Sequence, residues 1–352
     1  MSDFVVSTIL SGSSSSVQCT GKFLPKLSEP QVVLQRGNDL VLYKLSESGL
    51  ATLAHASLFR SIVALSFTNS QHFPSSLVFL TSHHEDTNSS IAVKIHANGL
   101  PNPSDSLGSP LEKPLLTIIS FENLDVLITA THCTRLSCTP LLKTQQQSLS
   151  SHHVPIDEVT ILSLHVLPSH PDHFLVLGDH VSPAGKKRFV SCYRAILDDT
   201  HSLISLSLGL FNRLEVPLGT TLAQPFTFSG RPVLIIAGTG FVQIKTMEST
   251  ETFDLDCCDV VSAVKNNNNH FLIVDCTGDT FEILFEPHLI VRPVPIILPG
   301  TEIINENSIK LMAITSSLSL LKENVFLLTF PFSDTLLLSF PLQVIVTLNK
   351  IH

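Results

Sequence analysis

The sequence predicts an all-β fold, a single seven-bladed β-propeller, and three observations support this prediction. One unit, in which two short apolar strands meet at a polar or glycine-bearing turn, recurs about seven times at roughly 50-residue spacing. Its clearest copies, Val32–Tyr43 and Phe271–Phe285, have the composition of β-hairpins. Helical periodicity is almost absent. A fixed period of this size is typical of a propeller or a related array of repeats.

Seven hairpins account for much of the chain, and further strand-like runs lie between them. In order, the hairpins are Gln31–Leu34 with Leu40–Leu45, Ser76–Thr81 with Ser90–His96, Asp125–Thr131 with Arg135–Leu142, Phe174–Leu177 with Phe189–Ile196, Val233–Ala237 with Phe241–Lys245, Phe271–Phe285, and Asn324–Phe330 with Thr335–Phe340. The runs between them are Ser61–Phe67, Leu115–Ser120, Val159–Val166, Leu203–Leu210, Ala223–Phe228, Ser262–Lys265 and Ile309–Ser316. Three or four strands per unit is the construction of a propeller blade, because packed blades bury the faces that one blade leaves exposed.

A separate strand candidate, Phe4–Leu10, lies before the first hairpin. The serine run Ser13–Ser16 that follows it has the composition of a flexible linker. We therefore divide the chain into an amino-terminal strand with a flexible lead, residues 1–16, and a propeller domain, residues 17–352. Within the propeller, the polar segment Ala97–Pro114 is predicted to be a disordered loop.

The composition provides a large core but few charges. Of the 352 residues, 43% are hydrophobic and 14% are charged, whereas about a quarter is usual for a soluble domain. The surface must therefore be largely uncharged and polar, or be covered by other proteins, which suits a subunit of an assembly. The net charge of −9 argues against a general nucleic-acid binder, which normally has a basic face.

The cysteines and the start of the chain indicate the compartment. Seven cysteines are scattered along the sequence without a Cys-x-x-Cys pair, which is typical of free thiols in a reduced compartment. Met1-Ser2-Asp3 does not resemble a secretory signal, and no apolar run reaches the ~20 residues of a membrane span. We expect a soluble nuclear or cytosolic protein with protein partners, no cofactor and no membrane association; direct contact with nucleic acid stays open.

Sixteen histidines invite a metal-site hypothesis. Adjacent residues on a strand point to opposite faces and cannot readily share a metal, and a zinc site needs three or four converging ligands. A structural or solvent-exposed role is therefore favoured for the densest groups, which are His83-His84, His152-His153, and His170 with His173 and His180. By similar reasoning Cys133 and Cys138 are predicted to pack across the third hairpin, and Cys257-Cys258 to lie at a strand edge or turn.

No motif predicts catalysis. A G-x-S-x-G nucleophile elbow is missing, and Gly238-Thr239-Gly240 precedes a strand instead of a helix, so we predict a hairpin turn there and not a phosphate-binding loop. Asp157-Glu158, Asp198-Asp199, and Asp254 with Asp256 fall in predicted loops without a partner that would identify an acid–base pair. We predict that the chain is not an enzyme and assign no catalytic, metal-binding or cofactor-binding residue.

Lys186-Lys187-Arg188 is the only basic cluster. Its predicted place is the turn of the fourth hairpin, where solvated charges are common. The alternative is a contact with an acidic partner or a phosphate backbone.

The order of several short segments resembles a known family. Phe4–Thr8, Val17–Phe23 and Tyr43–Leu50 at the start, Thr277–Phe281 in the sixth unit and Ser333–Leu338 in the seventh resemble the first propeller of the large subunit of the UV-damaged-DNA-binding complex. Relatives of that subunit serve the cleavage-and-polyadenylation specificity factor and the U2-associated splicing factor. The resemblance runs from about Phe4 to Phe340, and Ser333-Asp334-Thr335 is closest to the damaged-DNA-binding branch.

This resemblance implies a non-enzymatic adaptor role. Members of the family contain three propellers; the first and third grip a helical segment of a partner, and the middle one docks a cullin scaffold in the ubiquitin-ligase branch. The leading hypothesis is therefore an interaction scaffold of a cullin–RING ubiquitin ligase in DNA repair or chromatin. The alternatives are a subunit of a splicing or polyadenylation complex and, from another class, a propeller hydrolase with recurring acidic or histidine residues on inner strands, a pattern we do not find.

The family also leads to an expectation for the first strand. In the family this strand crosses to the third propeller, which a chain with the length of one propeller does not provide. An unpaired apolar strand is a template for β-augmentation. We therefore predict that the strand is flexible or pairs with another chain, through Phe4, Val5, Val6, Thr8 and Ile9.

Overall fold

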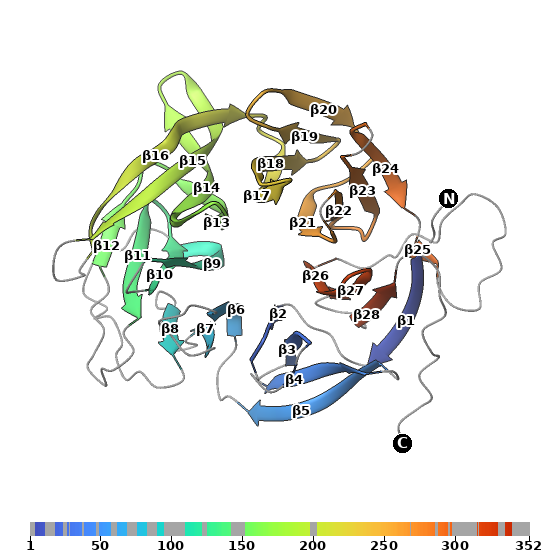
Figure 1. Ribbon diagram of the computed structural model, residues 1–352. Coiled ribbons are helices and arrows are strands. Elements are labelled where there is room, and N and C mark those ends of the chain that lie inside the picture. The colour runs from blue at the N-terminus through green and yellow to red at the C-terminus, as the bar shows by residue number, and fades with distance from the viewer. Residues whose placement is uncertain are drawn as a thin grey trace. The chain divides into compact units, whose positions relative to one another are not determined.

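The computed structural model describes residues 4–10, 18–23, 27, 29–36, 39–46, 49–57, 62–68, 76–82, 90–94, 110–121, 125–141, 152–197, 203–267, 269–285, 288–294, 296–297, 315, 317–329 and 335–339. Every regular element in these ranges is a β-strand, which confirms the predicted all-β class (Figure 1). Within them there is no helix with the length and apolarity that a membrane span requires. The chain divides into two compact units, unit 1 (Met1–Phe59, Thr239–Phe241 and Phe253–His352) and unit 2 (Arg60–Gly238 and Val242–Thr252).

Unit 2 contains four antiparallel sheets in its described part. A few residues of the fourth sheet belong to unit 1. The first has three strands, β6 (Ile62–Thr68), β7 (Ser76–Ser82) and β8 (Ser90–Lys94). The other three have four strands each: β9 (Pro110–Ser120), β10 (Asp125–His132), β11 (Arg135–Leu141) and β12 (His152–Pro155); β13 (Thr160–Leu167), β14 (His170–Ser182), β15 (Gly185–Leu197) and β16 (Leu203–Val216); and β17 (Thr220–Phe228), β18 (Arg231–Gly238), β19 (Phe241–Lys245) and β20 (Thr250–Asp254).

Unit 1 contains three sheets in its described part. Two are four-stranded: β2 (Gln18–Gly21), β3 (Gln31–Arg36), β4 (Asp39–Ser46) and β5 (Gly49–Ser57); and β21 (Val260–Lys265), β22 (His270–Asp275), β23 (Thr280–Leu284) and β24 (Ile290–Val294). The third has five strands in the order β25 (Ile296–Ile297), β1 (Phe4–Leu10), β28 (Thr335–Ser339), β27 (Val325–Thr329) and β26 (Ser317–Lys322).

Within each unit, neighbouring sheets meet through their first strands. Strands β6, β9, β13 and β17 contact one another in that order in unit 2, and β21, β26 and β2 do so in unit 1. Up-and-down sheets that pack in this way form a β-propeller, as predicted. Six of the sheets have four or more strands, but β6–β8 has three in its described part, so the predicted count of seven blades is not confirmed.

Burial explains why the hairpins are the clearest signals in the sequence. The second strand of a sheet lies between a first and a third strand and is covered on both faces, so it is apolar almost throughout. All six residues of β22 are buried, as are seven of the eight in β10. Fourth strands are exposed and more polar, as the sequence Thr-Glu-Thr-Phe-Asp of β20 illustrates.

Backbone hydrogen bonds repeatedly tie the turn after a second strand to the segment that enters the next sheet. In unit 2, Thr134 N donates to Glu158 O (3.2 Å) and Ile156 N donates to Thr134 O (2.9 Å). In unit 1, Gly240 N donates to Cys257 O (3.1 Å) and Leu255 N donates to Gly240 O (2.9 Å). Thr134 and Gly240 both have positive φ, 60° and 82°, which lets the turn offer its donor and its acceptor to the same segment.

The first strand is not unpaired, contrary to the expectation from the sequence. Strand β1 pairs antiparallel with β28, with Val6 opposite Leu338 and Thr8 opposite Leu336, and parallel with β25, with Phe4 opposite Ile296. The backbone of β28 provides the edge that the prediction sought in another chain. A partner-binding role for Phe4, Val5, Val6, Thr8 and Ile9 therefore loses its premise and stays an untested prediction.

Other predictions differ from the structure in extent. The fourth hairpin is longer than predicted, because β14 and β15 each have 13 residues. Leu203–Leu210 belongs to β16, the fourth strand of one sheet, and does not open the next. Strand β9 begins at Pro110, inside the segment predicted to be a disordered loop. The serine run Ser13–Ser16 and the rest of that loop lie outside the described residues.

Candidate functional site

The β14–β15 hairpin carries the basic cluster predicted from the sequence. Its turn lies at Pro183–Ala184, so the cluster Lys186–Arg188 stands on strand β15 and not in the turn. Arg188 Nε lies 2.7 Å and Lys186 Nζ 2.8 Å from the buried carboxylate of Asp179. Lys187 Nζ lies 2.9 Å from Glu215 on β16. Each cation of the cluster therefore has a carboxylate partner within the chain.

Asp179 makes this cluster part of the packing between two sheets. Burial alone would raise the pKa of Asp179, but hydrogen bonds from Arg188 and Lys186 outweigh burial and lower it. Arg188 Nη1 also donates to the backbone oxygen of Thr220, the first residue of β17, at 2.5 Å. The cluster links β14, β15 and β17, which favours a structural role over a contact with an acidic partner.

Apolar side chains are exposed at the end of the same hairpin. Val181 is 58% exposed, and Leu218, in the turn between β16 and β17, is 54% exposed. Strands β14 and β16 both run antiparallel to β15. The β14–β15 turn and the β16–β17 turn therefore lie at the same end of the strands of this sheet. Exposed residues of these turns are also uncharged. We call this set the hairpin-tip surface: Val181, Pro183, Ala184, Pro217 and Leu218.

A second polar group is buried at the other face of the same sheet. Glu158, which precedes β13, receives hydrogen bonds from the hydroxyl groups of Ser191 and Tyr193 on β15, the latter at 2.7 Å. Gly178 on β14 makes room for it, because a Cβ at this position would lie 2.7 Å from Glu158 Cγ and 2.6 Å from Thr160 O. A glycine inside a strand often marks such a close approach.

This Glu158 network is a packing element and not a reactive site. Burial and the neighbouring Glu158 carboxylate raise the pKa of the Tyr193 hydroxyl, so this group stays protonated. Ser191 is fully buried, so a substrate cannot reach its hydroxyl group. At the margin, Arg213 pairs with Asp157. The arrangement holds the segment that enters β13 against β15.

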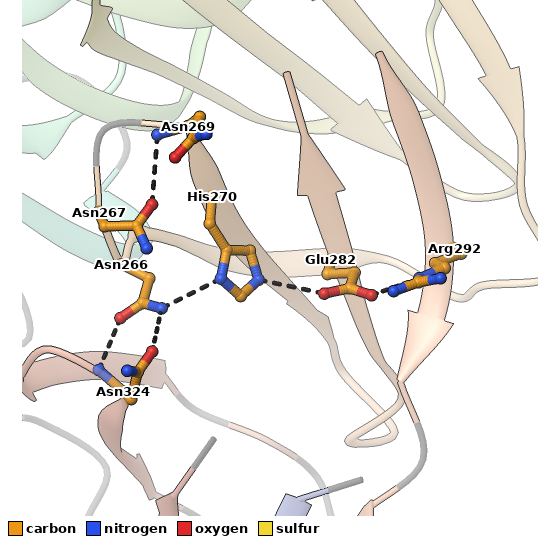
Figure 2. Close-up of polar contacts among 7 residues, drawn as sticks. All are labelled: Asn266, Asn267, Asn269, His270, Glu282, Arg292 and Asn324. Carbon is orange, nitrogen blue, oxygen red and sulfur yellow. Dashed lines mark hydrogen bonds and ion pairs between the residues drawn. The ribbon is translucent and has the colours of Figure 1, made fainter. Parts of the chain in front are cut away.

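A third polar network joins two sheets of unit 1 around His270 (Figure 2). The Asn266 side chain, at the end of β21, donates from Nδ2 to His270 Nδ1 (3.0 Å) and to Asn324 Oδ1 (2.7 Å). Its Oδ1 accepts from the backbone N–H of Asn324 at 2.7 Å. Asn324 lies in the turn between β26 and β27, where it has a positive φ of 64°. One amide group therefore contacts both sheets.

These contacts fix the protonation state of His270. Because Nδ1 accepts a hydrogen bond from Asn266, the proton of the neutral ring lies on Nε2, which is 3.3 Å from Glu282 Oε2. The other Glu282 oxygen pairs with Arg292 on β24. Burial lowers the pKa of His270; Glu282 opposes this shift and Arg292 reinforces it. His270 is therefore neutral at physiological pH.

The predicted histidine groups have individual polar or aromatic neighbours. His173 Nδ1 lies 2.7 Å from Asp172, and His153 Nδ1 lies 2.8 Å from Ser137 Oγ. The His170 ring packs against that of His173, and the His180 ring against Phe189. The residues that the structure describes contain no group of three or more potential ligands that could hold a metal ion. His83-His84 lies outside those residues.

The cysteines follow the packing prediction in part. Cys138 on β11 is fully buried in the core of unit 2, opposite Ile128, and burial raises the pKa of its thiol to about 12. Cys133 lies in the β10–β11 turn and packs against the same core. Cys257 and Cys258, predicted at a strand edge or turn, lie in the connecting segment between β20 and β21, and Gly238-Thr239-Gly240 spans the β18–β19 hairpin turn, as predicted. Burial also raises the pKa of the Cys257 thiol.

The residues at the centres of the buried networks do not stand out in the sequence. Glu158 has the pattern of a loop carboxylate, although the in-strand Gly178 is a signal for a close neighbour. Asn266 and His270 have the pattern of a turn before the sixth hairpin and nothing more. Their partner Asn324 lies 58 residues away from Asn266, and no local pattern indicates that pairing.

Comparison with known proteins does not assign a family to this chain. No protein-family model matches the sequence, and a search of curated proteins returns no significant match. Neither comparison bears on the resemblance to the UV-damaged-DNA-binding family.

Proposed function

We propose that the chain is a non-enzymatic protein–protein interaction scaffold, and that it binds a partner through the hairpin-tip surface. The propeller fold is consistent with such a role, since propellers commonly present loops and edges to partners. The observation that carries the proposal is the exposure of Val181 and Leu218 at one end of the strands of the β13–β16 sheet. Apolar surface rimmed by polar groups is typical of protein contacts.

The charges around this surface favour binding by burial. Lys186 and Lys187 are about half exposed, at 53% and 48%, but both already have carboxylate partners. A partner that covers Val181 and Leu218 would not have to neutralise a free cation of the cluster. Full burial of a completely exposed aliphatic side chain is worth about 1.5–3 kcal/mol, and Val181 and Leu218 would each contribute about half of that, because they are 58% and 54% exposed. Two of them therefore provide a useful anchor for an apolar segment of a partner.

More specifically, we propose that the chain is a seven-bladed propeller that acts in the nucleus or cytosol and resembles the first propeller of a cullin–RING ubiquitin ligase adaptor. The order of family-like segments and the low charge fraction of 14% support it. A splicing or polyadenylation subunit is the alternative from the same family. The proteins recovered with the full chain separate the two: a ligase substrate receptor supports the first, and RNA-processing factors support the second.

The test compares the tagged full chain with two variants in affinity purification from its own cells. The double variant Val181→Asp/Leu218→Asp should lose the partners that the wild type recovers, because it places two charges in the hairpin-tip surface. Met247→Asp is the matched control. Met247 is 81% exposed in the turn between the third and fourth strands of its sheet, β19 and β20, whereas the hairpin-tip surface includes the turn between the second and third strands of its own sheet, β14 and β15. Partners retained by the double variant would contradict the proposed surface, and turnover of a hydrolase substrate by the pure wild type would contradict the scaffold role.

A further inference from the structure

The amide of Asn266 is arranged so that it can make its contacts only while His270 is neutral. It donates to His270 Nδ1 and to Asn324 Oδ1, and it accepts from the backbone N–H of Asn324. A protonated His270 carries a proton on Nδ1 and no longer accepts there. Two donors, Asn266 Nδ2 and His270 Nδ1, would then face each other.

Rotation of the Asn266 amide does not remove this conflict. If Oδ1 and Nδ2 exchanged places, Oδ1 would accept from the protonated ring, but Nδ2 would face the backbone N–H of Asn324. That N–H is part of the main chain and cannot become an acceptor. A buried donor left without an acceptor costs about 1–3 kcal/mol. Protonation of His270 therefore opposes the contact with the β26–β27 turn in either orientation of Asn266.

We propose that Asn266, His270 and Asn324 form an acid-sensitive latch that holds the β26–β27 turn to the β21–β24 sheet at neutral pH and releases it on acidification. The latch is a property of unit 1 and does not depend on the proposed function.

The charged groups around the ring set the direction of this response. Glu282 on β23 favours the protonated ring, whereas Arg292 on β24 and burial of the ring oppose it. On β21, Lys265 lies with Nζ over the Phe271 ring, 5.9 Å from its centroid. The β26–β27 turn carries Lys322 and Glu323, both exposed, and presents the uncharged Asn324 to Asn266. The pKa of His270 lies below its ordinary value of 6.5 in the closed latch.

The pH dependence follows from this shift. A group whose pKa is lower when the latch is closed binds fewer protons in that state, so acid favours the open state. The effect is absent well above pH 6.5 and grows as the pH falls below it, until the pKa of the closed state is reached. Across that window, opening becomes up to about tenfold more frequent for each pH unit.

Amide hydrogen exchange of the full chain between pH 7.5 and 5 measures the latch directly. The Asn324 amide donates to Asn266 Oδ1 and reports opening, and the Phe285 amide, which donates to Asn269 O at 3.0 Å, is a reference in the same region. After correction for intrinsic exchange, the Asn324-to-Phe285 rate ratio should rise up to about fivefold between pH 6.5 and 5.5 in the wild type, because a ring with the ordinary pKa of 6.5 in the open state is already half protonated at pH 6.5. A ratio that stays flat would overturn the proposal.

Two variants separate the latch from general acid effects. His270→Asn keeps an acceptor near the Nδ1 position without a titrating group, so its ratio should be flat. Asn266→Asp provides a carboxylate that accepts from both protonated His270 and Asn324 N–H, so its ratio should fall on acidification. A wild-type slope in either variant would overturn the proposal, and the second variant decides the matter if the first does not fold.

Discussion

Two buried glutamates, one in each unit, show two ways to hold a carboxylate inside a sheet packing. Glu158 in unit 2 receives hydrogen bonds from two hydroxyl groups, those of Ser191 and Tyr193. Glu282 in unit 1 faces the imidazole of His270 and the guanidinium of Arg292. Hydroxyl donors do not titrate near neutral pH, whereas imidazole does. Similar burial therefore gives a constant contact in one unit and a pH-dependent contact in the other.

The largest expected effect comes from closing the space beside Glu158. In Gly178→Ala, the new Cβ would lie 2.6 Å from the backbone oxygen of Thr160, which cannot move without shifting β13. Overpacking of this kind destabilises by about 1–3 kcal/mol, and we expect the upper end of that range because the clash is with backbone. Urea unfolding of the full-length variant measures it.

The control for this prediction is Gly185→Ala. Gly185 has a positive φ of 118°, but a Cβ added there would meet no atom within 4 Å, so the variant tests backbone conformation without crowding. A smaller loss of stability is expected there. If Gly178→Ala were as stable as the wild type, the close approach of Glu158 to β14 would be wrong.

A smaller effect is expected when Glu158 loses one of its donors. Tyr193→Phe removes the hydroxyl that donates to Glu158 Oε2 at 2.7 Å and leaves a buried acceptor unpaired. The expected loss is about 1–3 kcal/mol, with the same value at pH 6 and pH 8 because the Tyr193 hydroxyl, whose pKa is raised by burial, stays protonated at both. Urea unfolding at the two pH values measures this. A loss that depends strongly on pH would remove the contrast between the two networks.

The smallest effect is expected at His270, and it should appear only in acid. The pKa of His270 is lowered in the folded protein, so its neutral form stabilises fully above pH 6.5 and this contribution declines as the pH falls below it. The decline is at most about 1.4 kcal/mol per pH unit. It is read as the difference between wild type and His270→Asn in unfolding free energy from pH 7.5 to 5.5.

The difference between the wild type and His270→Asn is needed because a second histidine also lowers the free energy of unfolding in acid. Burial lowers the pKa of His165 to about 4, so it also makes the folded protein less stable in acid. His165→Asn should keep the His270-dependent part of the slope. Identical slopes in the wild type and His270→Asn would show that His270 contributes nothing.

The comparison also explains what the sequence could predict. The hairpins were predictable because second strands such as β22 are apolar throughout, and turns such as Gly238-Thr239-Gly240 have a fixed chemistry. The lengths of β14 and β15 were not predictable, because the end of β14 and the start of β15 contain polar residues such as Asp179 and Arg188. These residues are held by a salt bridge that no local pattern reveals.

The pairing of β1 and the buried networks depended on distant residues. Strand β1 pairs with β28, which is more than 300 residues away in the sequence, so its local pattern could indicate a strand but not its neighbour. Likewise, Glu158 contacts Tyr193 and Asn266 contacts Asn324 across separate strands. Propeller packing brings such residues together, and no local pattern in the sequence indicates which distant strands will meet.

Both networks are internal to the packing, which leaves partner binding to the surface. The central claim is therefore that the hairpin-tip surface contacts a protein partner. Hydrogen exchange of the full chain, alone and in the complex recovered from its own cells, tests this claim most directly. We predict added protection of the turns around Pro183–Ala184 and Pro217–Leu218, and none around Met247. Added protection only around the Met247 turn, or no added protection of any of these turns, would contradict the claim that the hairpin-tip surface contacts a partner.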